Sequence, residues 1–218
     1  MSIDDRSTIV IDTQANEAQG RALLAQVQGR VLFVFNTHEH GDHIAGNRLF
    51  AGPIISSLQA KEAMLAEGMA DGLPNCCFSE QLRLQIADEE IRMQHFGGHC
   101  PGLAIMFLPQ SGLLFTGDLV FNGRAPWMGH ADFSRWIAVL EELATWDVQT
   151  VVPGHGCLGG KELLLHQQET LENFVADVQS WRNTGKGEAE MVELAAAKYA
   201  VKPAWYDMLR LAFKRVPR

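Results

Sequence analysis

Four side chains of the types that bind metal ions fall within six residues of one short segment. The segment reads Thr37-His38-Glu39-His40-Gly41-Asp42-His43, and the four are His38, His40, Asp42 and His43. A lone histidine is best interpreted as an ordinary core or surface side chain. Packing three imidazoles and a carboxylate this closely is costly unless a cation compensates. Imidazole and carboxylate are ligands that zinc accepts, so the segment predicts a zinc site.

The element before this segment explains how its side chains could converge. A continuous apolar run from Val31 to Phe35 predicts a buried strand that ends just ahead of the histidines. A strand end followed by a tight turn at Gly41 can direct His38 and His40 to one point and Asp42 and His43 to a second. Glycine allows that turn without a side-chain clash. We therefore expect two neighbouring metal positions at this strand end.

The segment matches the His-x-His-x-Asp-His signature of the metallo-β-lactamase superfamily, which the chain resembles. Three later segments are similar to that family's other metal motifs and follow in the same order. They are Gly97-Gly98-His99-Cys100-Pro101-Gly102, Phe115-Thr116-Gly117-Asp118 and Val151-Val152-Pro153-Gly154-His155-Gly156. The resemblance runs from about Ile9 to Leu165 and implies that Asp118 and His155 each lie at the end of a strand.

This resemblance implies a dinuclear metal site that holds two Zn²⁺, with Fe or Mn as other options. One ion would be bound by His38, His40 and His99, the other by Asp42, His43 and His155, and Asp118 would bridge both. Asp42 and Asp118 are also assigned catalytic roles. Such a ligand set leaves room for a bridging hydroxide, which would attack a carbonyl carbon.

The implied activity is that of a hydrolase, similar to glyoxalase II in its dinuclear site, acting on a small carboxyl derivative. The candidate substrates are a thioester, a lactone, an ester and a β-lactam. A formal net charge of −8 argues against a nucleic-acid partner, because phosphate binding needs a basic stripe. The loop Val120 to Ala131 could wall the pocket. Within it, Arg124 either binds a substrate carboxylate or is an ordinary surface arginine, with about equal weight.

Two other function classes stay open. A persulfide dioxygenase-like oxidoreductase would use one non-haem iron, and the complete second set of Asp42, His43 and His155 favours two ions instead. The flavodiiron pattern has glutamate where this chain has His40. A non-catalytic binding protein is less favoured, because all seven ligands are present and such a cluster is costly without metal.

Residues near the motifs receive lesser roles. Asp12, close to the family's usual Asp-Thr-Gly, is predicted to orient a ligand rather than to bind metal. Gln14 stands in place of the glycine of that triplet. We expect no ligand role for the remaining histidines, which are His95, His130 and His166. None of the cysteines is expected to be a nucleophile or to form a disulfide, and Cys76 and Cys77 are interpreted as loop fillers.

The fold class implied is α/β: a four-layer αββα sandwich of the metallo-β-lactamase type, with two mixed sheets and helices outside. We expect a single domain over residues 1–218, with C-terminal helices from about 161 to 218. Strands are predicted at Thr8–Ile11, Val31–Phe35, Ile54–Ser56, Ile91–His95, Leu103–Leu108, Leu113–Thr116 and Thr150–Val152. Helices are predicted at Ala15–Gln28, Leu58–Glu67, Phe133–Thr145, Lys161–Trp181, Glu188–Tyr199 and Ala204–Phe213.

Composition limits where the protein works. Apolar residues make up 47% of the chain, and no run approaches the roughly 20 apolar residues that span a bilayer. The first residues carry no apolar leader. We therefore expect a soluble, cytoplasmic protein with a small-molecule substrate and no membrane partner. The C-terminal helices could either cover the pocket or form a homodimer.

Overall fold

The computed structural model describes residues 1–4 and 6–217, with residues 2–4 described by their backbone alone. The chain divides into two compact units. Unit 1 contains Met1–Leu84, Arg92–Phe96 and Pro101–Met106, and unit 2 contains Gln85–Ile91, Gly97–Cys100 and the chain from Phe107 onward. A single domain over the whole chain stays a prediction.

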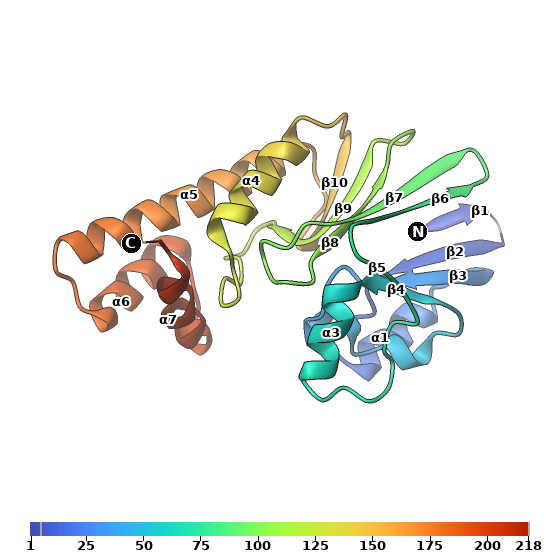
Figure 1. The fold of residues 1–218 in the computed structure, drawn as a ribbon, viewed down its shortest axis with the longest axis horizontal. Coiled ribbons are helices and arrows are strands. Elements are labelled where there is room, and N and C mark those ends of the chain that lie inside the picture. The colour runs from blue at the N-terminus through green and yellow to red at the C-terminus, as the bar shows by residue number, and fades with distance from the viewer. Residues whose placement is uncertain (5, 218) are drawn as a thin grey trace. The chain divides into compact units, whose positions relative to one another are not determined.

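A five-stranded sheet forms the centre of unit 1, in the order β1-β2-β3-β4-β5 (Figure 1). β1 is antiparallel to β2, and the remaining pairs are parallel. The strands are β1 (Ser2–Asp4), β2 (Ser7–Ile11), β3 (Arg30–Phe35), β4 (Ile54–Ser57) and β5 (Cys76–Phe78). Val10, Val34, Phe50 and Ile54 form a buried cluster. Burial of both β2 and β3 explains why these strands are nearly continuous apolar runs.

The helices of unit 1 are short. They are α1 (Glu17–Leu24), α2 (Gly41–Ile44), the 3-10 turn η1 (Asn47–Leu49) and α3 (Leu58–Ala66). Figure 1 shows α1 and α3 on one side of the β1–β5 sheet. α1 begins where Asn16 accepts a hydrogen bond from the Gln19 amide at 3.0 Å. It is shorter than predicted, because the backbone after Leu24 forms turns and reaches Gly29 at a φ of 70°.

A second five-stranded sheet has the order β10-β9-β8-β7-β6. Its strands are β6 (Gln81–Ile86), β7 (Glu89–His95), β8 (Ala104–Leu108), β9 (Leu113–Phe121) and β10 (Thr150–His155). β9 and β10 are parallel. β9 is longer than predicted, since Gly117 still pairs with Pro153 and Phe121 with His155. The expectation that Asp118 ends its strand is therefore wrong, because Asp118 lies inside β9.

The helices of unit 2 agree closely with the sequence prediction. They are α4 (Phe133–Ala144), α5 (Glu162–Asn183), α6 (Glu188–Tyr199), the 3-10 turn η2 (Pro203–Trp205) and α7 (Tyr206–Arg215). Asp132 caps α4 as expected, accepting a hydrogen bond from the Arg135 amide at 3.0 Å. α4 packs along α5, and Figure 1 shows α6 and α7 folded back against the far part of α5.

Three of the described strands were missed, β1, β5 and β6, and β6 had a visible sequence signal. Gln81–Ile86 alternates polar and apolar residues, the pattern of a half-buried strand, and its exposure alternates likewise. Cys76 and Cys77 lie in β5, so their interpretation as loop fillers is wrong. Their strand depends on parallel pairing with Ile55 and Ser56 of β4, which no local pattern indicates.

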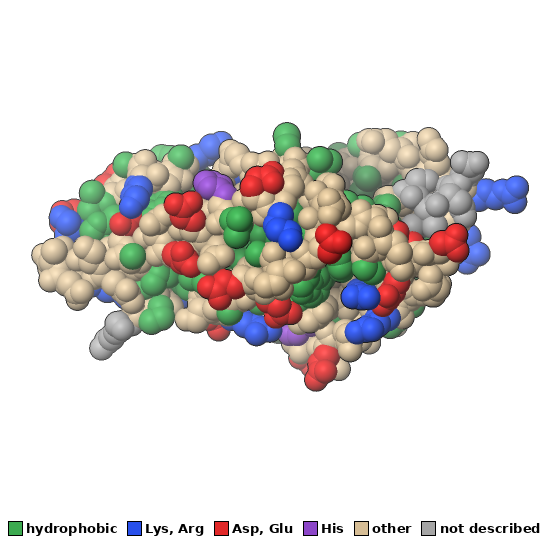
Figure 2. Space-filling model, turned by 90° about the horizontal axis from the view of Figure 1, so that it is seen from above, with side chains coloured by type: hydrophobic (Ala, Val, Ile, Leu, Met, Phe, Trp, Pro, Cys, Tyr) green, Lys and Arg blue, Asp and Glu red, His purple; other side chains and the backbone are tan. Residues whose placement is uncertain are grey.

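The predicted fold class is confirmed: the chain is α/β, with two sheets and helices. Within the described residues, no helix is both long and apolar enough to cross a bilayer. Acidic and basic side chains are interspersed over the face shown in Figure 2.

Candidate metal centre

The four predicted ligands of unit 1 lie on the loop and helix that follow β3. The ring centroids of His38 and His40 are 4.7 Å apart, and those of His38 and His43 are 4.1 Å apart. Ligand atoms of each pair lie within 4.8 Å, as do those of Asp42 and His43. His38 is fully buried and His43 is 3% exposed. The structure therefore brings His38, His40, Asp42 and His43 together as predicted.

Asp12, at the end of β2, orients two of these histidines. Its Oδ2 lies 2.7 Å from His43 Nδ1 and accepts a hydrogen bond from Thr37 Oγ1 at 2.8 Å. Because the Thr37 hydroxyl donates to Asp12, its oxygen accepts from His38 Nδ1, 2.9 Å away. Both rings then carry their proton on Nδ1, so Nε2 is the atom that each ring would offer to a metal ion. The structure places Asp12 against His43, the contact that the predicted orienting role needs, and the role itself stays a prediction.

The backbone around Asp12 is held in an uncommon conformation. Asp12 has a φ of 54° and Gln14 a φ of 77°, in the left-handed region that favours glycine. The intervening Thr13 amide donates to the His43 carbonyl at 2.6 Å. Such strain persists only where surrounding contacts hold it, and it concentrates at functional sites. The left-handed backbone at Gln14 thus explains why the family's usual residue at this position is glycine.

A buried polar cluster that the sequence analysis missed supports the same loop. Asn47 Oδ1 accepts hydrogen bonds from Thr13 Oγ1 at 2.8 Å and from Asn36 Nδ2 at 3.0 Å. Asn47 Nδ2 donates in return to Asn36 Oδ1 and to the Gly72 carbonyl, both at 2.8 Å. These hydrogen bonds tie the end of β3 to the turn that holds His43.

The three predicted ligands of unit 2 converge on one carboxylate oxygen. Asp118 Oδ2 lies 3.6 Å from His99 Nε2 and 3.6 Å from His155 Nε2. His99 and Asp118 are buried, whereas the His155 side chain is 22% exposed. The structure thus places a single carboxylate oxygen at the same distance from two imidazole nitrogens.

Aromatic side chains hold these imidazoles. Trp136 meets the His99 ring edge to face at 5.0 Å, and its Nε1 donates to the Leu119 carbonyl at 2.9 Å. Phe121 stacks on His155 at 5.3 Å. A Cβ on Gly98, whose φ is 92°, would lie 2.9 Å from Trp136 Cα. Glycine at position 98 therefore lets α4 approach the His99 loop closely.

The donor set and its spacing fit zinc. Around a tetrahedral zinc with bonds of about 2.0–2.2 Å, neighbouring donor atoms lie roughly 3.3–3.6 Å apart. Both distances to Asp118 Oδ2 are 3.6 Å, at the upper end of this range, and the distance from His43 Nε2 to Asp42 Oδ2 is slightly longer, at 3.8 Å. Nitrogen and carboxylate donors in this number suit zinc better than calcium or magnesium, which prefer oxygen alone.

Other residues fall in different places. His95 Nε2 lies 2.7 Å from the Pro101 carbonyl, His130 packs on Trp127, and His166 is exposed on α5. None of the three belongs to a ligand group found among the described residues. Cys100, to which the sequence analysis gave no metal role, is buried, and its Sγ lies within 4.8 Å of a ring nitrogen of His99.

The role predicted for Gly41 is wrong. Its φ is not positive, and a Cβ built on it would meet no described atom within 4 Å. The turn is made at His40, which stands in extended backbone at the N-cap of α2.

The loop between β9 and α4 borders the unit 2 ligands. Asn122 ties it to the end of β10, since its backbone N–H donates to the His155 carbonyl at 2.9 Å. Arg124 is exposed, and its Nη1 lies 3.5 Å from His155 Nδ1. Trp127 lies 6.1 Å from the His99 ring. The loop therefore places a cation and an aromatic side chain beside the predicted ligands of unit 2.

Comparisons with known proteins agree with this arrangement. The chain is 25% identical over 184 residues to a "Metallo-beta-lactamase type 2" of Bacteroides fragilis. The alignment covers 79% of this chain and 74% of that protein. It is 30% identical over 145 residues to the human "Persulfide dioxygenase ETHE1, mitochondrial", covering 62% of this chain and 50% of the relative. It is 33% identical over 101 residues to a "Hydroxyacylglutathione hydrolase" of Cereibacter sphaeroides, covering 44% and 37%.

The fold is similar to solved structures as well. A "Metallo-beta-lactamase from Pontibacter korlensis" superposes with a TM-score of 0.69 at 25% identity, covering 78% of this chain and 84% of that one. The model of the metallo-beta-lactamase superfamily matches residues 3–55 and 86–155. The chain therefore belongs to the metallo-beta-lactamase superfamily, whose members bind metal ions and are mostly hydrolases.

Proposed function

We propose that this protein is a zinc-dependent hydrolase that cleaves a small carboxyl derivative, a thioester before a lactone, ester or β-lactam. The observation that carries the proposal is the position of Asp118 Oδ2, 3.6 Å from both His99 Nε2 and His155 Nε2. A carboxylate oxygen so placed can be shared by two ions, one bound by each histidine.

The proposed ligand set is the one that the family resemblance implies. The first ion is assigned to His38, His40 and His99, the second to Asp42, His43 and His155, with Asp118 shared. When bound, two zinc ions supply Lewis acidity toward a carbonyl oxygen and make water nucleophilic near neutral pH. The dinuclear state and the identity of the metal are parts of this proposal.

The chain's own residues prepare that site. Asp12 and Thr37 hold the protons of His43 and His38 on Nδ1, so both rings present Nε2 without a change of tautomer. Trp136 and Phe121 pack on the rings of His99 and His155, which limits their rotation and excludes water from one side. Preorganised ligands of this kind lower the cost of assembling the reactive arrangement.

A hydrolase that acts on thioesters is supported by similarity to a hydroxyacylglutathione hydrolase. Similarity to persulfide dioxygenases supports a second candidate, an iron-dependent oxidoreductase. The two candidates differ in the number of ions, because only the two-ion site needs Asp42, His43 and His155 together. A small-molecule substrate, a cytoplasmic location and a homodimer stay predictions.

The test is elemental analysis of purified protein together with hydrolysis assays on a thioester, a lactone and a chromogenic β-lactam. We expect about two equivalents of zinc, and activity that a chelator removes and added zinc restores. His155→Ala should lose about one equivalent, whereas His166→Ala, on the exposed face of α5, should keep both. One equivalent of iron, with oxygen consumed on a persulfide and no hydrolysis, would replace this proposal by the oxidoreductase.

A further inference from the structure

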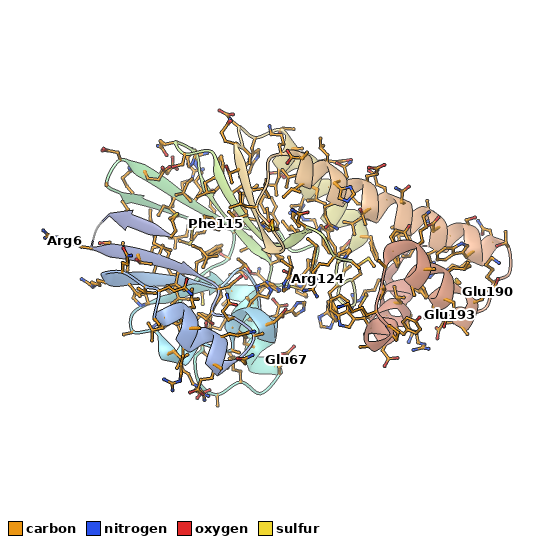
Figure 3. All side chains as sticks on the ribbon, turned by 180° about the vertical axis from the view of Figure 1, so that it is seen from behind. Arg6, Glu67, Phe115, Arg124, Glu190 and Glu193 are labelled. Carbon is orange, nitrogen blue, oxygen red and sulfur yellow. The ribbon has the colours of Figure 1, made fainter. Side chains whose placement is uncertain are left out.

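The C-terminal helices contact the loop between β9 and α4 at two points. The Arg124 guanidinium carbon lies 4.8 Å from the centroid of the Trp205 ring, which belongs to η2. Arg215 Nε, at the end of α7, donates to the Gly129 carbonyl at 2.8 Å. Figure 3 shows Arg124 beside these helices. The superfamily match ends at residue 155, so the contacts come from a segment beyond it.

That segment is firmly anchored within unit 2. Arg182 of α5 donates to the Val216 carbonyl at 3.0 Å and also to the Phe213 carbonyl. Phe174 stacks on Phe213 at 6.0 Å and meets Tyr199 of α6 edge to face at 5.4 Å. The helices α6 and α7 therefore form a fixed support for the loop.

A hydrogen bond reinforces this support. Tyr199 donates to Asp177 Oδ2 of α5 at 2.5 Å, and Lys198 forms an ion pair with the same carboxylate at 2.6 Å. Burial, and then the hydrogen bond to Asp177, raise the pKa of Tyr199 far above its usual range. The phenol thus stays protonated, and keeps its hydrogen bond, across the pH range in which hydrolysis would be measured.

The position of Arg124 fits it to bind an anion. An arginine whose face lies on an aromatic ring keeps its N–H groups in the plane of the fork, where a carboxylate is bound through two hydrogen bonds. The 3.5 Å separation from His155 Nδ1 is too long for a strong hydrogen bond, so it records proximity. The guanidinium is exposed next to a predicted metal ligand.

We propose that Trp205 is a positioning residue, through which the C-terminal helices hold Arg124 as an anion-binding group that selects substrates bearing a carboxylate. This inference rests on the proposed function, since it assigns a substrate class to the same site. It also gives the C-terminal helices a role in specificity rather than in covering the site or forming a dimer.

The test compares two thioesters that differ only in a distal carboxylate or its neutral amide. Trp205→Ala should raise KM for the anionic thioester about 5- to 20-fold, the range expected for a lost cation–π contact. The kcat for this thioester, and both KM and kcat for the neutral amide, should stay within about 2-fold of the wild type. Trp205→Phe should restore most of the loss. Arg124→Gln should raise the same KM at least 10-fold, and the double variant should add little.

A binding measurement separates this inference from the proposed function. Calorimetry measures the binding of two non-hydrolysable thioethers, one with the distal carboxylate and one with its neutral amide, and needs no catalysis. Weaker binding of the carboxylate alone in Trp205→Ala, with unchanged metal content and melting temperature, would support the inference even if no thioester were cleaved. Leu211→Ala, an exposed change on α7, is the control. Equal losses for both ligands, or none for either, would overturn it.

Discussion

In unit 1 the predicted ligands lie on a short loop and the start of α2, which hydrogen bonds hold, whereas in unit 2 they lie on two strands and a loop that packing holds. Asp12 contacts His43 directly, and Asn47 forms a hydrogen bond with Thr13 in the neighbouring segment, where the backbone is strained at Asp12 and Gln14. Trp136 and Phe121 hold the second set. We therefore expect loss of a single polar group to disturb the ligands of unit 1. The ligands of unit 2 should instead be sensitive to changes in side-chain volume.

Asp118→Asn should have the largest effect, because it removes the one charge shared by His99 and His155 without changing shape. We expect a fall in thioester hydrolysis of more than about 100-fold, above the cost of losing a supporting hydrogen-bond partner. Zinc content should fall below two equivalents while the melting temperature of the metal-free protein stays within a few degrees. Retention of full metal content and rate would show that Asp118 is not shared.

Asp12→Ala tests the polar half of the comparison. Loss of the carboxylate frees the protons of His38 and His43 to move between ring nitrogens, so zinc affinity should fall about 10- to 100-fold. Competition with a chromophoric chelator measures the change. The zinc affinity of Asp12→Asn should lie between those of the wild type and Asp12→Ala. The side-chain oxygen of asparagine can still accept a hydrogen bond from the Thr37 backbone N–H, which lies 2.8 Å from Asp12 Oδ1 in the wild type. An unchanged zinc affinity in both variants would show that Asp12 does not orient the predicted ligands.

Gly154→Ala tests the packing half. Its Cβ would lie 2.0 Å from Asp118 Oδ1 and 2.8 Å from the Gly117 carbonyl carbon, so Asp118 must move. We expect the free energy of unfolding to fall by about 1–3 kcal/mol and zinc content to fall with it.

Gly41→Ala is the matched control, since its Cβ meets no described atom within 4 Å. It should leave the free energy of unfolding unchanged or raise it by up to about 1 kcal/mol. Equal destabilisation by the two alanines in chemical denaturation would contradict the distinction between a packed and an open glycine.

Gln14→Gly should have the smallest effect and the opposite sign. Relief of the left-handed conformation gains about 1–2 kcal/mol, and the added freedom of glycine in the unfolded chain costs about 0.5–1 kcal/mol. A net stabilisation of roughly 0.5 kcal/mol should appear in urea denaturation, whereas Gln14→Ala should show none. Destabilisation by glycine would mean that the exposed Gln14 side chain makes a contact worth more than the strain.

Local pattern predicted most of the regular structure. The apolar runs of β2, β3 and β8 and the helical spacing of α4 and α5 were sufficient, because each buries a continuous face. β5 could not be predicted from its own residues, since its pairing partner lies 21 positions earlier at Ile55. β6 was missed although its alternation was visible.

For the site, sequence determined which residue types are available, because the ligand motifs consist of a few residues in a fixed order and metal chemistry restricts their types. The sequence also predicted that Asp12 orients a ligand, but only the tertiary structure decided that this residue is His43. It alone revealed the Asn36–Asn47 pair and the contact of Trp205 with Arg124. Each of these contacts joins residues at least 11 positions apart, and such a contact depends on how elements pack rather than on any local pattern. The sequence identifies the side chains that could react, and the fold determines how they are oriented.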